Sequence, residues 1–148
     1  MARYFISLII LLTSIVYTIV TTGSAVLTYI DIPSLIIVGV LPLVFVTALF
    51  GFKNMTSAFS IPSKKETNKE ELTAGLCFFK TYGITIWIAG FISVLIAVVG
   101  MLKNLEDKKM LGPLVALALV SLLYCGILYM TIIIPFTVFI NKKGSKEP

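Results

Sequence analysis

The sequence has no histidine and few charged side chains, and both shortages limit the chemistry it can carry. Only 13% of its 148 residues are charged, whereas 58% are hydrophobic and the mean hydropathy is +1.04. All seven acidic residues lie outside the long apolar runs. Metal sites and acid–base pairs need such side chains close together. We therefore expect a membrane protein that is not an enzyme and holds neither a metal nor a cofactor.

Cysteine is also scarce, since Cys77 and Cys125 are the only two and make no disulfide framework. Cys125 stands inside an apolar run, so we expect a small buried residue there. The net charge is +5, but the lysines stand in groups beside apolar segments instead of alternating with aromatic residues. They indicate membrane topology and no nucleic-acid partner.

Four apolar runs cover residues 4–22, 33–52, 78–102 and 111–140. Each reaches the roughly 20 residues that a helix needs to cross a bilayer, and helices satisfy their own backbone hydrogen bonds in lipid. The sequence thus predicts an all-α fold: one membrane domain, residues 1–148, with four spanning helices and a polar loop over 53–77. A second reading of the first run is a secretory signal peptide, with Arg3 before an apolar core and the small residues of "TGSA" after it.

Lysine and arginine are distributed unevenly over the two predicted sides of the membrane. One side would hold Arg3, Lys53, Lys64, Lys65, Lys69, Lys80, Lys142, Lys143 and Lys146, and the other Lys103, Lys108 and Lys109. Because positive residues favour the cytoplasmic side, we expect the 53–77 segment and both termini in the cytoplasm.

Small residues recur on the third and fourth runs at helical spacing. Gly83, Gly90 and Ala97 follow at intervals of seven, and the fourth run carries Ala118 and Cys125 on one stripe. Small residues let membrane helices pack closely. Two arrangements remain open: the stripes pack on each other, or they line a shared axis in an oligomer.

Hydroxyl groups are the only polar side chains expected deep in the third and fourth spans. Thr85, Ser93, Ser121 and Thr131 each fit a simple bond to a carbonyl one turn back. Pro135 removes one backbone hydrogen bond, which predicts a bend, either a passive kink or a hinge. No acid or base lies in the spans, so any titrating group for ion transport belongs to a partner.

Two segments resemble the MotA/TolQ/ExbB family. "YIDIPSLIIVGV", residues 29–40, resembles the start of the second MotA membrane helix. Residues 100–135, "GMLKNLEDKKMLGPLVALALVSLLYCGILYMTIIIP", resemble the hairpin of helices three and four, with its Gly-Pro start and late proline. The two segments occur in the family's order.

The resemblance implies a bacterial inner-membrane subunit that assembles as a pentameric ring in the lipid bilayer. Five copies surround two copies of a single-span MotB/ExbD/TolR-like partner that carries the titrating aspartate, and the complex acts as a proton channel of the stator type. The implied ion-path and partner-facing positions are Ser93, Val94, Ser121 and Leu122, and Pro135 is the implied hinge.

The chain also departs from the MotA pattern. The large cytoplasmic domain between helices two and three is replaced by about 25 polar residues, and Trp87 stands where MotA has a proline. Val94 stands where sodium-type stators have a threonine, which disfavours sodium as the coupling ion. Leu122 stands where the family has a threonine that contacts the ion path. These departures keep an alternative open: a non-conducting oligomeric scaffold with the same fold.

Overall fold

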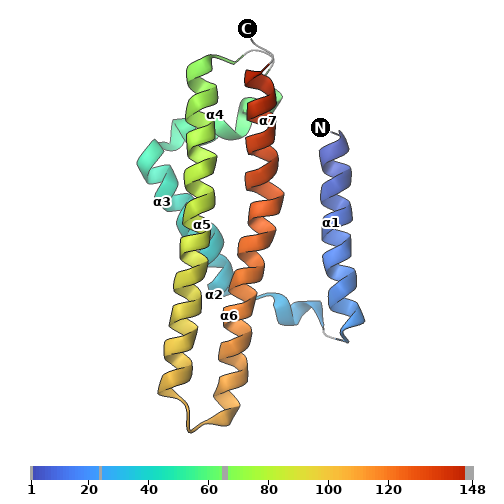
Figure 1. Ribbon diagram of the computed structural model, residues 1–148, viewed down its shortest axis with the longest axis vertical. Coiled ribbons are helices and arrows are strands. Elements are labelled where there is room, and N and C mark those ends of the chain that lie inside the picture. The colour runs from blue at the N-terminus through green and yellow to red at the C-terminus, as the bar shows by residue number, and fades with distance from the viewer. Residues whose placement is uncertain (1, 24, 65–66, 146–148) are drawn as a thin grey trace. The chain divides into compact units, whose positions relative to one another are not determined.

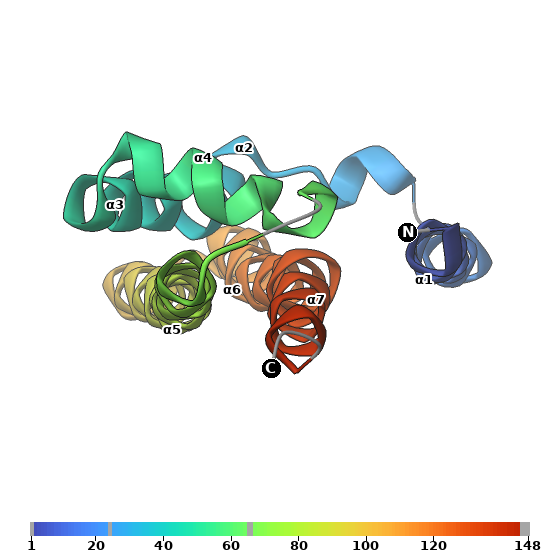
Figure 2. The same ribbon diagram turned by 90° about the horizontal axis from the view of Figure 1, so that it is seen from above.

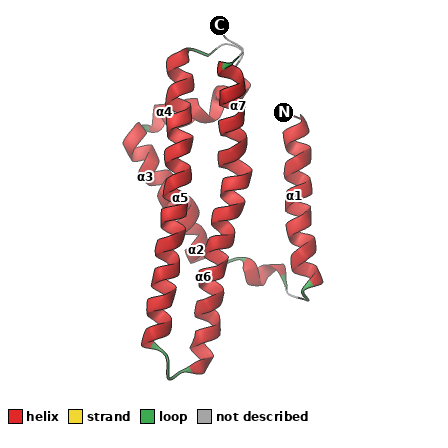
Figure 3. Cartoon of the chain, viewed as in Figure 1, coloured by secondary structure: helices red, strands yellow, loops and turns green. Residues whose placement is uncertain are grey.

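The computed structural model describes residues 2–23, 25–64 and 67–145, with side chains from residue 4 onward. All regular elements in this part of the chain are helical (Figure 3). In order they are α1 (Ala2–Thr21), a 3₁₀ turn (Val26–Tyr29), α2 (Ile32–Leu35), a π turn (Ile36–Val40), α3 (Leu41–Phe50), α4 (Phe52–Ser60), a 3₁₀ turn (Ile61–Ser63), α5 (Lys69–Lys103), α6 (Lys108–Leu128), a second π turn (Tyr129–Ile133) and α7 (Ile134–Gly144).

Four helical stretches within the described residues are long and apolar enough to cross a membrane. They are Tyr4–Thr21, Ile32–Phe50, Lys69–Lys103 and Lys108–Gly144. The expectation of an all-helical chain with four spans is therefore confirmed at this level. Of the residues in the predicted topology count, Lys65 and Lys146 lie outside the described residues, as does the side chain of Arg3.

The chain divides into two compact units, residues 1–32 and 33–148. The first contains α1, in which several hydroxyl side chains bond carbonyls of the same helix. Ser7 donates to the carbonyl of Tyr4, and Thr18 to that of Ser14. These bonds satisfy polar groups of an apolar helix without any outside partner.

The second unit is a hairpin of two long helices with a shorter, broken helix along one side. α5 runs antiparallel to α6 and α7, and α3 and α4 pack against α5 (Figure 1). Seen from above, α2, α3 and α4 lie together on one side of the hairpin (Figure 2). The hairpin turn falls at residues 104–107, where the Asp107 carboxylate accepts a hydrogen bond from the Lys109 N–H at 3.0 Å.

One proline in the second span, Pro42, and one in the fourth, Pro135, each follow a π turn. The N–H of Leu41, directly before Pro42, donates to the carbonyl of Ile36, five residues back. The N–H of Ile134, directly before Pro135, likewise donates to Tyr129. The wider turn accommodates a residue that has no N–H and would crowd the carbonyl four residues earlier. The sequence predicted a bend at Pro135; the structure has a π turn directly before this residue, and the bend stays a prediction.

The segment expected as a polar loop, residues 53–77, contains more helix than its composition suggested. Gly51, with φ +82°, turns the chain from α3 into α4. Met55, Ala58 and Phe59 lie on the covered side of α4, whereas Lys53 is exposed. α5 already begins at Lys69, because two acidic residues in its first turn favour a helix start there.

Candidate functional site

The small residues of α5 form the contact with α6, the second π turn and α7 of the same chain. A Cβ built on Gly83 would lie 2.9 Å from Tyr129 Cε2, and one on Gly90 would collide with Cys125 Sγ. Ala97 and Ala118 are buried along the same hairpin. Of the two arrangements left open by the sequence, the structure has the stripes packed on each other.

Three buried serines meet inside this unit and form a hydroxyl cluster. Ser121 Oγ lies 2.7 Å from Ser93 Oγ, 3.0 Å from Ser34 Oγ and 2.9 Å from the carbonyl of Leu117. Each of the three serines is at most 3% exposed. The cluster therefore connects α2, α5 and α6 by side-chain hydrogen bonds within their candidate spans.

Ser121 stands at the centre of the hydroxyl cluster and has more neighbours than hydrogens. A serine hydroxyl donates one hydrogen bond and accepts up to two. With three oxygens within 3.0 Å, Ser121 donates to one of them at a time. Several hydrogen arrangements are thus compatible with the same oxygen positions.

The predicted ion-path residues fall into two groups. Ser93 and Ser121 are buried in the hydroxyl cluster, facing the interior of the chain's own fold. Their neighbours in sequence are less covered: Leu122 is 40% exposed, and Val94 is half-buried. The structure thus brings the serines together and places an apolar side chain at the outer surface. The ion-path role of these four residues stays a prediction.

The remaining predicted positions lie along the same helices. Thr85 donates to the carbonyl of Tyr82 at 2.9 Å, and Thr131 to that of Ile127 at 2.7 Å, so both bond one turn back. Ser93 instead has Ser121 as its hydrogen-bonding partner. Cys125 is fully buried, and its thiol lies 3.5 Å from the carbonyl of Ile86. Pro135 is half-buried beside the second π turn.

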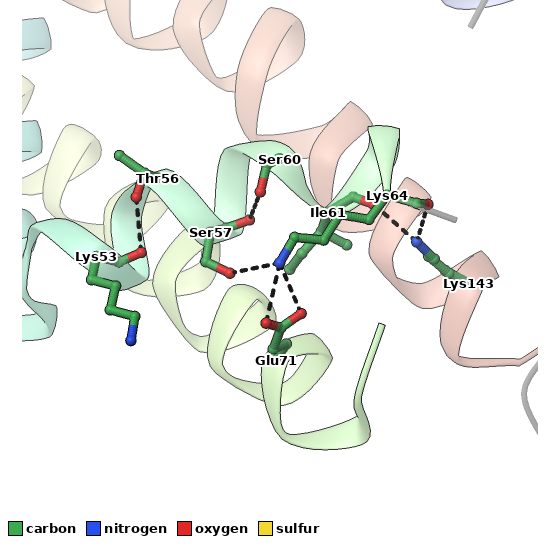
Figure 4. A network of polar contacts seen from close by, with 8 residues as sticks. All are labelled: Lys53, Thr56, Ser57, Ser60, Ile61, Lys64, Glu71 and Lys143. Carbon is green, nitrogen blue, oxygen red and sulfur yellow. Dashed lines mark hydrogen bonds and ion pairs between the residues drawn. The ribbon is translucent and has the colours of Figure 1, made fainter. Parts of the chain in front are cut away.

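A network of charged and polar groups joins α4, α5 and α7 at the end of the second unit that lies opposite the hairpin turn at residues 104–107 (Figure 4). Lys64 Nζ lies 3.0 Å from Glu71 Oε2 and 3.4 Å from Ser57 Oγ. Lys143 of α7 donates to the carbonyl of Ile61 at 3.1 Å and to the carbonyl of Lys64. A lysine ammonium that binds carbonyls at the end of another helix satisfies groups that the helix leaves unpaired. The network therefore ties α4 and its following turn to both α5 and α7.

Three residues in these contacts were not singled out from the sequence. Ser34 belongs to the 29–40 segment that resembles the second MotA helix, but no local pattern indicates a partner for its hydroxyl. Tyr82 donates to the carbonyl of Gly39 at 3.3 Å, a pairing of residues 43 positions apart that no local pattern signals. Lys143 belonged to a group of lysines read only as a topology signal.

Within the described residues, no group of three or more histidine, cysteine or acidic side chains could hold a metal ion. The charged side chains gather at the ends of the long helices, and none occurs between residues 81 and 102 or between 110 and 141. What these long helices offer chemically is a buried set of hydroxyls and an apolar outer surface.

Comparison with known proteins gives two partial similarities, and no family model matches the sequence. The chain is 32% identical over 78 residues to the chemotaxis protein PomA of Vibrio alginolyticus, covering 53% of this chain and 31% of PomA. It is 31% identical over 100 residues to the uncharacterized protein YtxD of Bacillus subtilis (strain 168), covering 68% of this chain and 37% of YtxD. The chain thus spans about a third of the length of the curated relatives it matches.

The four apolar helices and these similarities support a multi-pass protein of the inner membrane. More particularly, the chain is similar to MotA-like membrane proteins.

Proposed function

We propose that the chain is a minimal MotA-like subunit of a proton-channel complex of the stator type. Five copies form a ring around two copies of a single-span MotB/ExbD/TolR-like partner, which supplies a titrating aspartate. The subunit performs no enzymatic reaction and needs no cofactor. Its similarity over 78 residues to a chemotaxis protein supports a role of this kind.

The observation that carries the proposal is the lack of ionisable groups in the spans of a MotA-like chain. Residues 81–102 and 110–141 contain no Asp, Glu, Lys, Arg or His. Intramembrane ion pathways are usually marked by ionisable residues. A subunit of this kind needs another protein to supply the titrating carboxylate. In the proposed complex, the single-span partner supplies it.

The outer surface near the hydroxyl cluster favours protons as the coupling ion. Leu122 and Val94 are apolar, while the hydroxyls of Ser93 and Ser121 are bonded inside the fold. A sodium ion needs oxygen ligands that replace its water shell. Proton transfer to a carboxylate of the partner makes no such demand on the subunit.

The first experiment measures the oligomeric state of the detergent-solubilised chain by native mass spectrometry. A ring predicts a mass of five subunits, with or without the co-expressed partner. A monomer under all mild detergent conditions would overturn the ring and with it the proposed complex.

The second experiment measures proton flux in liposomes that contain the chain and its partner. The partner is sought as a neighbouring gene that encodes one membrane span with an aspartate, followed by a periplasmic domain. We expect flux with the native partner and none when its aspartate is changed to asparagine. Proton flux that does not depend on this aspartate, or no flux under any condition, would contradict the proposed channel.

A non-conducting scaffold is the second candidate. The apolar side chains of the exposed Leu122 and the half-buried Val94, and the short connection between the second and third spans, favour it. A stable ring that shows no flux with any single-span partner would identify the scaffold, whereas acid-dependent flux would exclude it.

A further inference from the structure

The two π turns interrupt separate spans, yet one helix contacts both. α5 continues without a break from Lys69 to Lys103 between them. Tyr82 donates to the carbonyl of Gly39, within the first π turn (Ile36–Val40), at 3.3 Å. Its neighbour Gly83 packs under Tyr129 and Ile133 of the second π turn. Two adjacent residues of α5 thus contact both interruptions.

The two interrupted segments also lie against each other. A Cβ built on Gly39 would be 3.5 Å from Leu128 Cδ1, and Leu128 directly precedes the second π turn. Tyr82 is 3% exposed, so its hydroxyl meets the Gly39 carbonyl in a closed environment. The π turns therefore lie at one level of the second unit.

On either side of this level, the two interrupted spans are held together. On the side of the N-terminal end of α5, the rings of Phe59 and Phe136 are 5.2 Å apart, and Lys143 bonds the carbonyl of Ile61. These contacts join α4 to α7. On the other side, Ser121 bonds Ser34 and joins α6 to α2. Before the π turns, α2 is thus tied to α6; after them, α7 is tied to α4, which follows α3 beyond the turn at Gly51.

We propose that the two π turns form one coupled hinge, which moves α3, α4 and α7 together relative to α2 and α6. Converting a π turn to α-helix rotates the following helix by about one residue's step, roughly 100°, with about 1.5 Å of translation. Because α4 and α7 are joined, such a change in one span displaces the other. Tyr82 and Gly83 connect the turns through α5.

The coupled hinge is independent of the proposed channel, since it concerns this chain alone. It is tested by NMR relaxation dispersion on the labelled chain in detergent micelles, which detects exchange on the microsecond to millisecond scale. We expect the amides of residues 36–41 and 129–134 to exchange with one common rate. Two unrelated rates, or no exchange at either turn, would overturn the proposal.

The variant Tyr82→Phe removes only the hydroxyl that bonds the first π turn. We expect it to change the populations at the second π turn as well, by roughly twofold or more, although the hydrogen bond it removes is to Gly39 in the first π turn. Tyr17→Phe, in α1, is the matched control and leaves both turns unchanged. A change confined to residues 36–41 would show that the turns act separately.

The variant Gly83→Ala changes the contact with the second π turn directly, because its methyl group meets Tyr129 and Ile133. We expect altered exchange at the first π turn, at the same rate as at the second. Gly126→Ala is the matched control, since a Cβ there meets nothing within 4 Å. If Gly83→Ala fails to fold, Tyr82→Phe decides the question, because it preserves the ring and its packing.

Discussion

Ser121 joins three helices through a single oxygen atom, and its removal should affect more than one bond. The change Ser121→Ala leaves the buried hydroxyls of Ser34 and Ser93 without their shared neighbour. Side-chain hydrogen bonds between membrane helices contribute about 0.6 kcal/mol on average and up to about 1.7. We expect a loss of roughly 1–2 kcal/mol in the free energy of unfolding, measured in bicelles.

Thr85→Ala is the matched control for the hydroxyl cluster. The Thr85 hydroxyl bonds only carbonyls of its own helix, at Thr81 and Tyr82. Its removal should cost no more than a few tenths of a kcal/mol, because no bond between helices is lost. Equal effects of the two changes would show that the cluster does not link the helices energetically.

Gly90 lets α5 and α6 pack closely, because Cys125 Sγ occupies the place that a side chain at position 90 would need. In Gly90→Ala the added methyl group collides with Cys125 Sγ, and overpacking of a filled interior costs about 1–3 kcal/mol. We expect a lower thermal midpoint by circular dichroism and partial recovery in the double variant Gly90→Ala/Cys125→Ala. No recovery would mean that the cost arises elsewhere along the hairpin.

At the residue scale, the sequence identified which hydroxyls lie in the third and fourth spans, but not their partners. Ser93 and Ser121 were marked because hydroxyls are rare in these runs. Their bond to each other depends on the rotation of α5 against α6, and the link to Ser34 depends on where α2 packs. Neither quantity is encoded in local spacing.

At the scale of elements, hydropathy predicted four helices but not where they end. α5 has 35 residues and at about 1.5 Å per residue exceeds a hydrocarbon layer of about 30 Å. Hydropathy marks the apolar part alone, so the first turns of α5 were expected as loop. The helix continues there because it packs against α4: Leu72 and Gly75 are buried, and a Cβ built on Gly75 would lie 3.9 Å from the Cα of Ala58 in α4.

Lys143 holds the end of α7 against the turn that follows α4. In Lys143→Met the carbonyls of Ile61 and Lys64 lose their cationic donor, while the apolar stem of the side chain is kept. We expect faster hydrogen exchange at residues 60–64, measured by mass spectrometry, with little change in α6.

Lys142→Met is the matched control, since it removes the same charge one position earlier from an exposed side chain. If both variants exchange equally fast at residues 60–64, net charge rather than the Lys143 bonds stabilises the turn.

At the scale of the whole molecule, the two cysteines report on membrane orientation. Cys77 is exposed and Cys125 is buried. With the connection between the second and third spans in the cytoplasm, a membrane-impermeant maleimide should label the chain in inside-out vesicles and not in intact cells. Cys77→Ser should abolish the labelling, because Cys125 is covered.

Labelling of intact cells instead would reverse the predicted topology. The orientation was inferred from nine basic residues on one side against three on the other. The helices themselves fit a bilayer in either direction, since their lengths and apolar character are unchanged by inversion. Orientation thus stays a prediction of charge alone, while the helical architecture follows from hydropathy and chain length.

The buried hydroxyl cluster carries a dipole whose direction depends on which serine donates each hydrogen bond. Either Ser93 or Ser121 can be the donor between their two oxygens, so the cluster dipole can take more than one direction with the oxygens in the same positions. In surroundings of low dielectric constant, such a dipole responds strongly to a nearby charge. A positive charge at the outer surface near Leu122 would favour the arrangement whose lone pairs point toward it, so the hydrogen positions of the cluster would depend on nearby charge.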